Sequence, residues 1–356
     1  MSFDALLERP AYGIPRAEKD ALLLDSLREM TAHHRRACPE YARILEGMWN
    51  GGGPAPTLAD LPFLPVSLFK ARTMRSVPET EVRMTMTSSG TTGQTVSRIA
   101  VDAETSLRQQ RALMHSVRHV LGPKRLPMLV IDTAGVVRDP ALMSARGAGV
   151  MGMMRFGRDH AFALDGDLKP DLPAIRAFME AHGDGPFFMF GFTFLVWVRF
   201  AEALAEAGLD LSHGILLHSG GWKSMVERAV DNAVFRDRLA AWLNLTAVHN
   251  FYGMVEQLGS ILLEGPDGRL YPPNVSQVVV RDPDTLEPLP DGEAGLVQVL
   301  SAIPLSYPGH SLLTEDLGVI EASDPGDGWM GAGLRILGRV PKADLRGCSD
   351  ALARAA

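Results

Sequence analysis

Residues 87–95 read Thr-Ser-Ser-Gly-Thr-Thr-Gly-Gln-Thr, a stretch of nine positions with six hydroxyl side chains and two glycines. Hydroxyl groups, together with backbone N–H groups that glycine leaves accessible, are the donors that a phosphate chain requires. No Gly-Lys-Ser/Thr sequence follows, so the stretch is not the common phosphate-binding loop of nucleoside triphosphatases. Such a run is also typical of an ordinary polar turn, and the rest of the chain decides between the two interpretations.

The composition indicates a globular chain with a substantial core. The 356 residues suffice for one large or two ordinary domains, and 46% are hydrophobic against 22% charged. The formal net charge of −7 argues against a surface for nucleic acids or anionic membranes. We expect no membrane span, because no apolar run approaches the ~20 residues that one requires. The two cysteines and the absence of an apolar N-terminal signal region predict a cytoplasmic protein with reduced thiols.

Short apolar runs alternate with helical patterns, which predicts an α/β fold with a mostly parallel sheet. We expect helices over 16–49, 104–121 and 193–207, and strands over 82–86, 97–101, 127–132, 187–190, 215–218 and 247–252. Ligands of such sheets bind beyond the carboxyl ends of the strands, which here include the Gly220-Gly221 and Tyr252-Gly253 turns. From Tyr271 onward, strand patterns at 278–280 and 295–300 predict hairpins of a smaller β-rich subdomain.

Four motifs follow the hydroxyl-rich stretch in order along the chain. They are His-Ser-Gly-Gly-Trp at 218–222, Asn-Phe-Tyr-Gly-Met-Val-Glu at 250–256, Leu-Thr-Glu-Asp at 313–316 and Leu-Gly-Arg at 337–339. Each motif is weak alone, but their order and spacing together resemble the adenylate-forming superfamily of acyl-CoA ligases, firefly-type luciferases and adenylation domains. This resemblance covers roughly residues 60–345.

A second resemblance is narrower and spans nearly the whole chain. It is carried by Cys-Pro-Glu-Tyr at 38–41, Leu-Pro-Phe-Leu-Pro-Val-Ser-Leu-Phe-Lys at 61–70, His-Ser-Gly-Gly-Trp-Lys at 218–223 and Arg-Gly-Cys-Ser at 346–349. These residues are similar to the acyl-protein synthetase family, the ligase subunits of bacterial bioluminescence fatty acid reductase complexes and their relatives. The resemblance implies the large α/β domain of adenylate-forming enzymes. We expect a helical and α/β core over 1–270, a β-rich subdomain over 271–340 and a C-terminal tail over 341–356.

The resemblance also implies an ATP site. It assigns the pyrophosphate end of ATP to Thr87, Ser88, Ser89, Gly90, Thr91, Thr92 and Gly93. It assigns the adenine region to Ser219, Gly220, Gly221, Tyr252 and Gly253, and the ribose to Asp316 and Arg339. An acceptor-only carboxylate suits the two hydroxyl donors of a ribose. The structural alternative is a plain strand-to-helix turn for Gly220 and Gly221 and a strand aromatic for Tyr252. It is a turn aspartate for Asp316 and a surface arginine for Arg339.

Joining a carboxylate to AMP brings an anion against a polyanion, so catalysis has to neutralise charge and align the reactants. A carboxylate near the α-phosphate is suited to hold Mg²⁺, and the Tyr-Gly-x-x-Glu pattern implies that role for Glu256. The alternative is a glutamate at a helix start, where the helix dipole favours it. Lys223 is a further catalytic candidate that could reach a phosphate, and otherwise a surface lysine. Phe188, Phe190, Phe192 and Phe194 lie where the superfamily builds its acyl pocket, or else belong to the core.

The end of the chain departs from the superfamily pattern. Typical members continue past the Gly-Arg motif with a small domain that brings a lysine, whereas only residues 340–356 follow Arg339, too few for a folded domain. Cys348 matches the cysteine that accepts the acyl group in acyl-protein synthetases. A thiol tethered near an acyl-adenylate has a high effective concentration, and Arg346 favours its thiolate. We therefore expect acyl transfer through Cys348, the alternative being an incidental tail cysteine.

The sequence predicts an enzyme that uses ATP and Mg²⁺ to convert a fatty or aromatic acid into acyl-AMP with release of pyrophosphate. The acyl group then passes through Cys348 to a partner protein such as a reductase, or to an acyl carrier. An alternative changes the acceptor to CoA, a carrier arm or an amine, as in phenylacetate–CoA ligases and coenzyme F390 synthetases. A third hypothesis is a non-enzymatic nucleotide-binding or scaffold protein, which the intact Glu256 and Asp316 disfavour.

Overall fold

The computed structural model describes residues 3–88, 96–138, 145–222, 227–326 and 328–340. Contacts divide the chain into two compact units. Unit 1 contains residues 1–116, 253–262 and 269–356, and unit 2 contains residues 117–252 and 263–268. The chain therefore passes from unit 1 to unit 2 within α5 (Ala103–Leu121) and returns after Tyr252. The domain boundaries predicted at 270 and 340 come from sequence patterns and not from contacts, so they stay a prediction.

Unit 2 is built on a parallel sheet of five strands in the order β5-β4-β6-β7-β8. Their bounds are β4 Leu126–Thr133, β5 Gly157–Leu164, β6 Phe187–Phe192, β7 Gly214–Ser219 and β8 Ala247–Tyr252. Strands covered on both faces are continuously apolar, which is why β4, β6 and β7 were recognisable as short apolar runs. The predicted parallel sheet is confirmed, because each of these neighbouring pairs is parallel.

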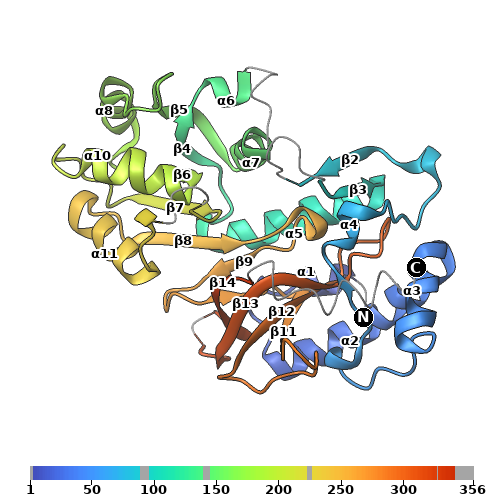
Figure 1. The fold of residues 1–356 in the computed structure, drawn as a ribbon. Coiled ribbons are helices and arrows are strands. Elements are labelled where there is room, and N and C mark those ends of the chain that lie inside the picture. Colours follow the sequence, from blue (N-terminus) through green and yellow to red (C-terminus); the bar gives the residue numbers. More distant parts are fainter. Residues whose placement is uncertain (1–2, 89–95, 139–144, 223–226, 327, 341–356) are drawn as a thin grey trace. The chain divides into compact units, whose positions relative to one another are not determined.

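One face of this sheet packs against α8 (Leu172–His182), α11 (Asn232–Leu243) and the helical segment 193–204, which Figure 1 shows along the same strands. Asp171 and Asp231 begin α8 and α11, because each carboxylate accepts a backbone N–H of the first turn. The predicted helix 193–207 is interrupted: α9 (Thr193–Leu195) and α10 (Glu202–Leu204) flank η4 (Val196–Ala201), a π-helical segment. Its wider turn buries four side chains together, those of Val196, Trp197, Phe200 and Ala201.

The opposite face of the unit 2 sheet carries Phe188, Phe190 and Phe192, because alternate residues of a strand point to opposite faces. Phe188 and Phe190 are buried, whereas Phe192 at the carboxyl end is half-buried. A Cβ atom built on Gly149 of α7 (Ala145–Met154) would lie 3.1 Å from Phe192 Cζ. Helix α7 therefore covers this face beside the end of β6, and α6 (Gly135–Arg138) follows β4.

Unit 1 contains the β-rich region expected after residue 271. Antiparallel strands follow in the order β11-β12-β13-β14-β10, and β1 (Leu64–Pro65) runs parallel to β13. The bounds are β10 Leu270–Tyr271, β11 Ser276–Arg281, β12 Ala294–Ser301, β13 Ser311–Ser323 and β14 Ala332–Arg339. Strand β9 (Leu262–Glu264) spans the point where the chain passes between the units.

The helical region predicted over 16–49 is two helices, α2 (Arg16–Ala37) and α3 (Pro39–Trp49). The break lies at Cys38, which is extended because Pro39 disfavours the helical conformation of the residue before it. Figure 1 shows α2 beside β11 and β12, where Leu23 and Leu27 pack in a cluster with Leu300. Short helices α1 (Phe3–Leu7) and α4 (Leu68–Ala71) and the 3₁₀ turns η1 (Leu58–Asp60) and η2 (Glu79–Glu81) complete this region.

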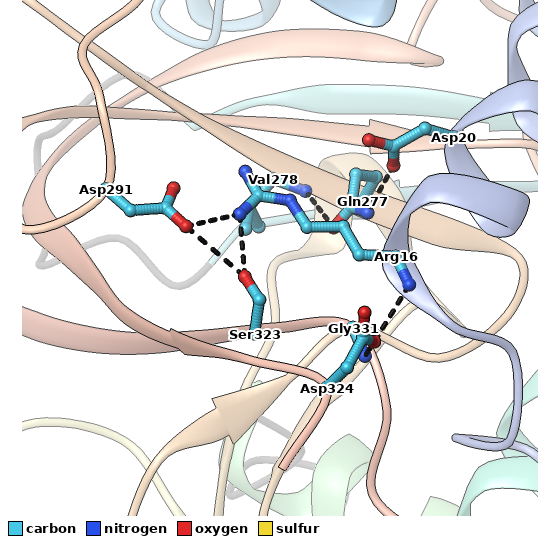
Figure 2. Close-up of polar contacts among 8 residues, drawn as sticks. All are labelled: Arg16, Asp20, Gln277, Val278, Asp291, Ser323, Asp324 and Gly331. Carbon is cyan, nitrogen blue, oxygen red and sulfur yellow. Dashed lines mark hydrogen bonds and ion pairs between the residues drawn. The ribbon is translucent and has the colours of Figure 1, made fainter. Parts of the chain in front are cut away.

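The start of α2 is tied to the end of β13 (Figure 2). Asp324 Oδ1 accepts the backbone N–H of Arg16 at 2.8 Å and that of Gly331 at 2.7 Å. The Arg16 guanidinium donates to Asp291 and Ser323 at 2.5 and 2.7 Å. Pro15 provides no side-chain cap, so a carboxylate more than 300 positions away performs that function for the first turn.

None of the helices in the described ranges has the length and apolar character to cross a membrane.

Candidate active site

The base of the hydroxyl-rich stretch is a closed β-hairpin. Strands β2 (Met84–Thr87) and β3 (Arg98–Val101) are antiparallel, with Thr87 opposite Arg98. Ser88 N–H donates to Ser97 O at 3.3 Å, and Ser97 N–H donates to Ser88 Oγ at 3.0 Å. The predicted strands are confirmed, and their pairing brings both ends of the stretch together. The candidates Ser89, Gly90, Thr91, Thr92 and Gly93 lie outside the described residues.

Glu256 lies in a 3₁₀ turn, η6 (Val255–Gln257), and only 5% of its surface is exposed. Among the described residues, no ion pair or hydrogen bond holds its carboxylate. The carboxylate oxygens are not completely buried, so a cation from outside the protein can reach them while the rest of the side chain is held in place. The described ranges hold no cluster of three His, Cys, Asp or Glu able to hold a metal alone. A single carboxylate such as that of Glu256 suits Mg²⁺, which takes one or two carboxylates from a protein and completes its coordination shell with phosphates and water.

Asp316 and Arg339, the two ribose candidates, are neighbours across β13 and β14. They are register partners, and Arg339 Nε lies 3.4 Å from Asp316 Oδ1. The Asp316 side chain is 17% exposed and that of Arg339 is 70% exposed. Thr314 Oγ1 accepts the Asp316 N–H at 3.2 Å and donates to Val297 O at 2.7 Å. Thr314 thus fixes the backbone that carries Asp316. The ion pair between Asp316 and Arg339 adds little stability by itself, because the arginine is largely exposed.

In unit 2, the adenine candidates lie at the carboxyl ends of β7 and β8. Ser219 is the register partner of Phe251, and its hydroxyl donates to Phe251 O at 2.9 Å. Gly220 follows with φ of 89°, a left-handed conformation that favours glycine. Tyr252 ends β8, and Gly253 begins the segment that belongs to unit 1. The fold thus places Ser219, Gly220 and Tyr252 at the same edge of one parallel sheet, where ligands of such sheets bind.

A buried network fixes β8 just before Tyr252. The carboxylate of Glu264, 1% exposed, accepts hydrogen bonds from Arg236 Nη1 at 2.8 Å, Asn232 Nδ2 at 2.5 Å and the Asn250 N–H at 2.7 Å. His249 Nδ1 donates to the Glu264 carbonyl at 2.8 Å. Sequence reasoning missed this network because its members form no local motif and are up to 32 positions apart.

The histidine of the His-Ser-Gly-Gly-Trp motif belongs to the core. His218 is 2% exposed, lies 3.0 Å from Thr193 Oγ1 through Nδ1, and packs against Phe235 with ring centroids 4.6 Å apart. Burial lowers its pKa to about 4, so the imidazole is neutral. At the end of β4, burial raises the pKa of Asp132, which pairs with Arg146 Nε at 3.2 Å. Neither group has the setting of a metal ligand.

Two catalytic candidates, Lys223 and Cys348, lie outside the described residues. The other cysteine, Cys38, is fully buried at the junction of α2 and α3. Burial raises the pKa of its thiol, which makes Cys38 a poor nucleophile.

Comparison with protein families gives a match over nearly the whole chain. The family model described as "Acyl-protein synthetase, LuxE" matches residues 5–356. A long-chain-fatty-acid–luciferin-component ligase of Aliivibrio fischeri is 24% identical over 306 residues, covering 83% of this chain and 79% of its own. The ligase of that name from Vibrio harveyi is 24% identical over 337 residues, covering 91% and 85%.

Solved structures share the fold. The open conformation of 2-hydroxyisobutyryl-CoA ligase in complex with 2-HIB-AMP and CoA superimposes with a TM-score of 0.67 at 16% identity, over 94% of this chain and 78% of that one. ATP-bound MatB from Rhodopseudomonas palustris gives a TM-score of 0.50 at 16% identity, over 74% and 49%. The α/β fold expected from the resemblance to adenylate-forming enzymes is therefore confirmed.

Proposed function

The chain is a ligase that belongs to the acyl-protein synthetase family, and we propose that it activates a carboxylic acid as acyl-AMP and transfers the acyl group to Cys348. The observation that carries the proposal is the family match over residues 5–356, together with a buried Glu256 that has no cationic protein partner in the described ranges. The acid is fatty or aromatic. The final acceptor is a partner protein such as a reductase, or an acyl carrier.

In the first step a carboxylate oxygen of the acid attacks the α-phosphorus of ATP. The acyl–O–P bond forms, the bond between the α-phosphorus and the bridging oxygen breaks, and pyrophosphate leaves with the electron pair. Glu256 would hold Mg²⁺, which neutralises phosphate charge when bound. Thr87 and Ser88, with the rest of the hydroxyl-rich stretch, orient the pyrophosphate end, and Asp316 orients the ribose. Alignment and charge neutralisation are the two contributions that this reaction needs.

In the second step the Cys348 thiolate attacks the carbonyl carbon of acyl-AMP. The thioester bond forms and the acyl–oxygen bond to AMP breaks, so AMP leaves. A tethered thiol is effective because its local concentration is high. Cys38 is unsuited to the role, because it is fully buried and its pKa is raised.

The first experiment measures pyrophosphate release from ATP with a panel of fatty and aromatic acids. We expect release to depend on the acid and to fall about 10²- to 10³-fold in Glu256→Gln, the range for loss of a major electrostatic contribution. The exposed Glu293→Gln is the matched control and should match the unchanged protein. Adenylation is excluded if no acid stimulates release, and the role of Glu256 is excluded if both variants behave alike.

The second experiment tests the acceptor with radiolabelled acid, ATP and Mg²⁺. Cys348→Ala should lose the hydroxylamine-labile protein label and still release pyrophosphate, whereas Cys38→Ala should keep the label. A label retained in Cys348→Ala would contradict the thiol step. If AMP is released only when CoA, a carrier protein or an amine is added, the alternative acceptor is correct.

A further inference from the structure

The loop that joins β12 to β13, residues 302–310, has no helix or strand of its own, yet it is buried within unit 1. Ser306, Tyr307 and His310 are at most 1% exposed. A buried loop needs partners for its backbone, and side chains of two helices supply them. Thr105 Oγ1 of α5 accepts the N–H groups of Leu305 and Ser306 at 3.2 and 3.0 Å. His34 and His33 of α2 donate to the carbonyls of Pro304 and Leu305 at 3.2 and 3.0 Å.

One side of this loop holds the hairpin that carries the hydroxyl-rich stretch. Ser306 Oγ donates to the carbonyl of Ala100 in β3 at 2.9 Å, and its own carbonyl accepts the Ser76 N–H at 2.7 Å. Ala100 is the register partner of Thr85 in β2. The Ser306 hydroxyl is therefore bonded to the strand that returns from the stretch.

The other side of the loop holds the turn that carries Glu256. Tyr307 Oη, completely buried, donates to the Glu256 carbonyl at 2.9 Å. Gln257 Nε2 donates to Gly309 O at 2.8 Å and to Val299 O at 3.1 Å. A Cβ atom on Gly309 would lie 2.3 Å from Tyr307 Cε2 and 2.9 Å from Glu256 O, so only glycine fits there. These bonds restrain the turn at the carbonyl of Glu256 and at the next residue, Gln257.

We propose that Ser306 and Tyr307 are positioning residues that hold Glu256 in register with the hydroxyl-rich hairpin. The two are consecutive, with Cα atoms about 3.8 Å apart, and they bond to different segments, β3 and the turn of Glu256. Because the two residues are adjacent, their hydrogen bonds hold the hairpin and the turn of Glu256 in a fixed position relative to each other. The inference rests on the proposed function, because it requires both parts to meet the same Mg²⁺-bound nucleotide.

The test measures the affinity for ATP by calorimetry, once with Mg²⁺ and once with a chelator. Tyr307→Phe removes the hydroxyl donor and keeps the ring, so we expect Mg²⁺-dependent affinity to weaken about 2- to 10-fold, the range for one hydrogen bond. Affinity without Mg²⁺ should not change, because the hairpin stays in place. Tyr271→Phe, another completely buried tyrosine of unit 1, is the matched control and should match the unchanged protein in both conditions.

Ser306→Ala is the second variant, and it keeps the inference testable if Tyr307→Phe does not fold. It should weaken ATP binding with and without Mg²⁺, because it releases the hairpin. Equal affinities for Tyr307→Phe and Tyr271→Phe, or an unchanged Ser306→Ala, would overturn the positioning role while the proposed function stands. If the unchanged protein binds no ATP, both proposals are wrong. If it binds ATP but no acid stimulates pyrophosphate release, only the proposed function fails.

Discussion

We expect three buried histidines to make the folded protein less stable in mild acid. His34, His218 and His310 are at most 2% exposed. Burial lowers the pKa of His218 to about 4 and that of His310 to about 3. For His34, burial together with the nearby His310 and His33 lowers the pKa well below 6.5. His218 and His310 are therefore neutral in the folded protein at pH 5, where an unfolded histidine is protonated.

The folded pKa values lie below the unfolded value of 6.5, so the unfolded chain binds the protons first as pH falls. The free energy of unfolding therefore decreases from pH 6.5 downward, and the decrease continues until each folded pKa is reached. A histidine with pKa of about 4 folded and 6.5 unfolded contributes a loss of about 2 kcal/mol between pH 7 and pH 5. His218 and His310 together cost about 4 kcal/mol, a large part of the ~5–15 kcal/mol of typical domain stability, and the lowered pKa of His34 acts in the same direction.

The assay is urea unfolding of His310→Gln at pH 7, 6 and 5. A glutamine amide can replace the contact of His310 Nε2 with Thr31 Oγ1 at 2.9 Å and does not titrate. Any packing cost is the same at each pH, so the pH 7 to pH 5 loss should shrink by about 2 kcal/mol. The exposed His213→Gln serves as the control and should keep the loss of the unchanged protein. A His310→Gln profile parallel to that of the unchanged protein would refute the reasoning.

Three further substitutions test the network of Figure 2, the Glu264 network and the end of β6. Asp324→Ala should lower the free energy of unfolding by about 1 kcal/mol, since two backbone N–H groups lose their acceptor, and Asp324→Asn should lose less in the same urea titration. Arg236→Met should cost about 3 kcal/mol by leaving the buried Glu264 without its counter-charge, and adding Glu264→Gln should restore part of the loss. Phe192→Ala should shift the preference among acids that stimulate pyrophosphate release toward longer or bulkier ones, because it removes the half-buried ring beside Gly149. An unchanged preference would exclude a role of Phe192 in binding the acyl group.

Much of the sheet in unit 2 could be predicted from local patterns. Strands β4, β6 and β7 are short apolar runs, because both of their faces are covered. Strand β5 was not predicted, since Arg158, Asp159 and His160 expose its first half at the sheet edge and interrupt the pattern. The helix break at Cys38 was also missed, although the proline after it was a readable signal.

In the candidate site, too, the residues of local motifs could be predicted and their partners from distant segments could not. The residue types of the predicted ATP site, among them Glu256, Asp316 and Tyr252, were named from motifs, because each motif is a short continuous segment. The residues that hold them were not, because Tyr307 is 51 positions from Glu256 and Asn232 is 32 positions from Glu264. Buried polar groups bond to whatever the fold brings near, and a local pattern carries no record of that partner.

The sequence alone determined the family and the α/β fold, because ordered motifs and apolar strand runs are properties of neighbouring residues. It also predicted that Asp316 and Arg339 serve one ligand, but not that they are partners on adjacent strands. Only the tertiary structure decided that Glu256 is buried beside Tyr307 and that Ser306 bonds to the hairpin of the hydroxyl-rich stretch. Hydrogen bonds and burial depend on distance in space, and the folding of distant segments onto one another sets that distance.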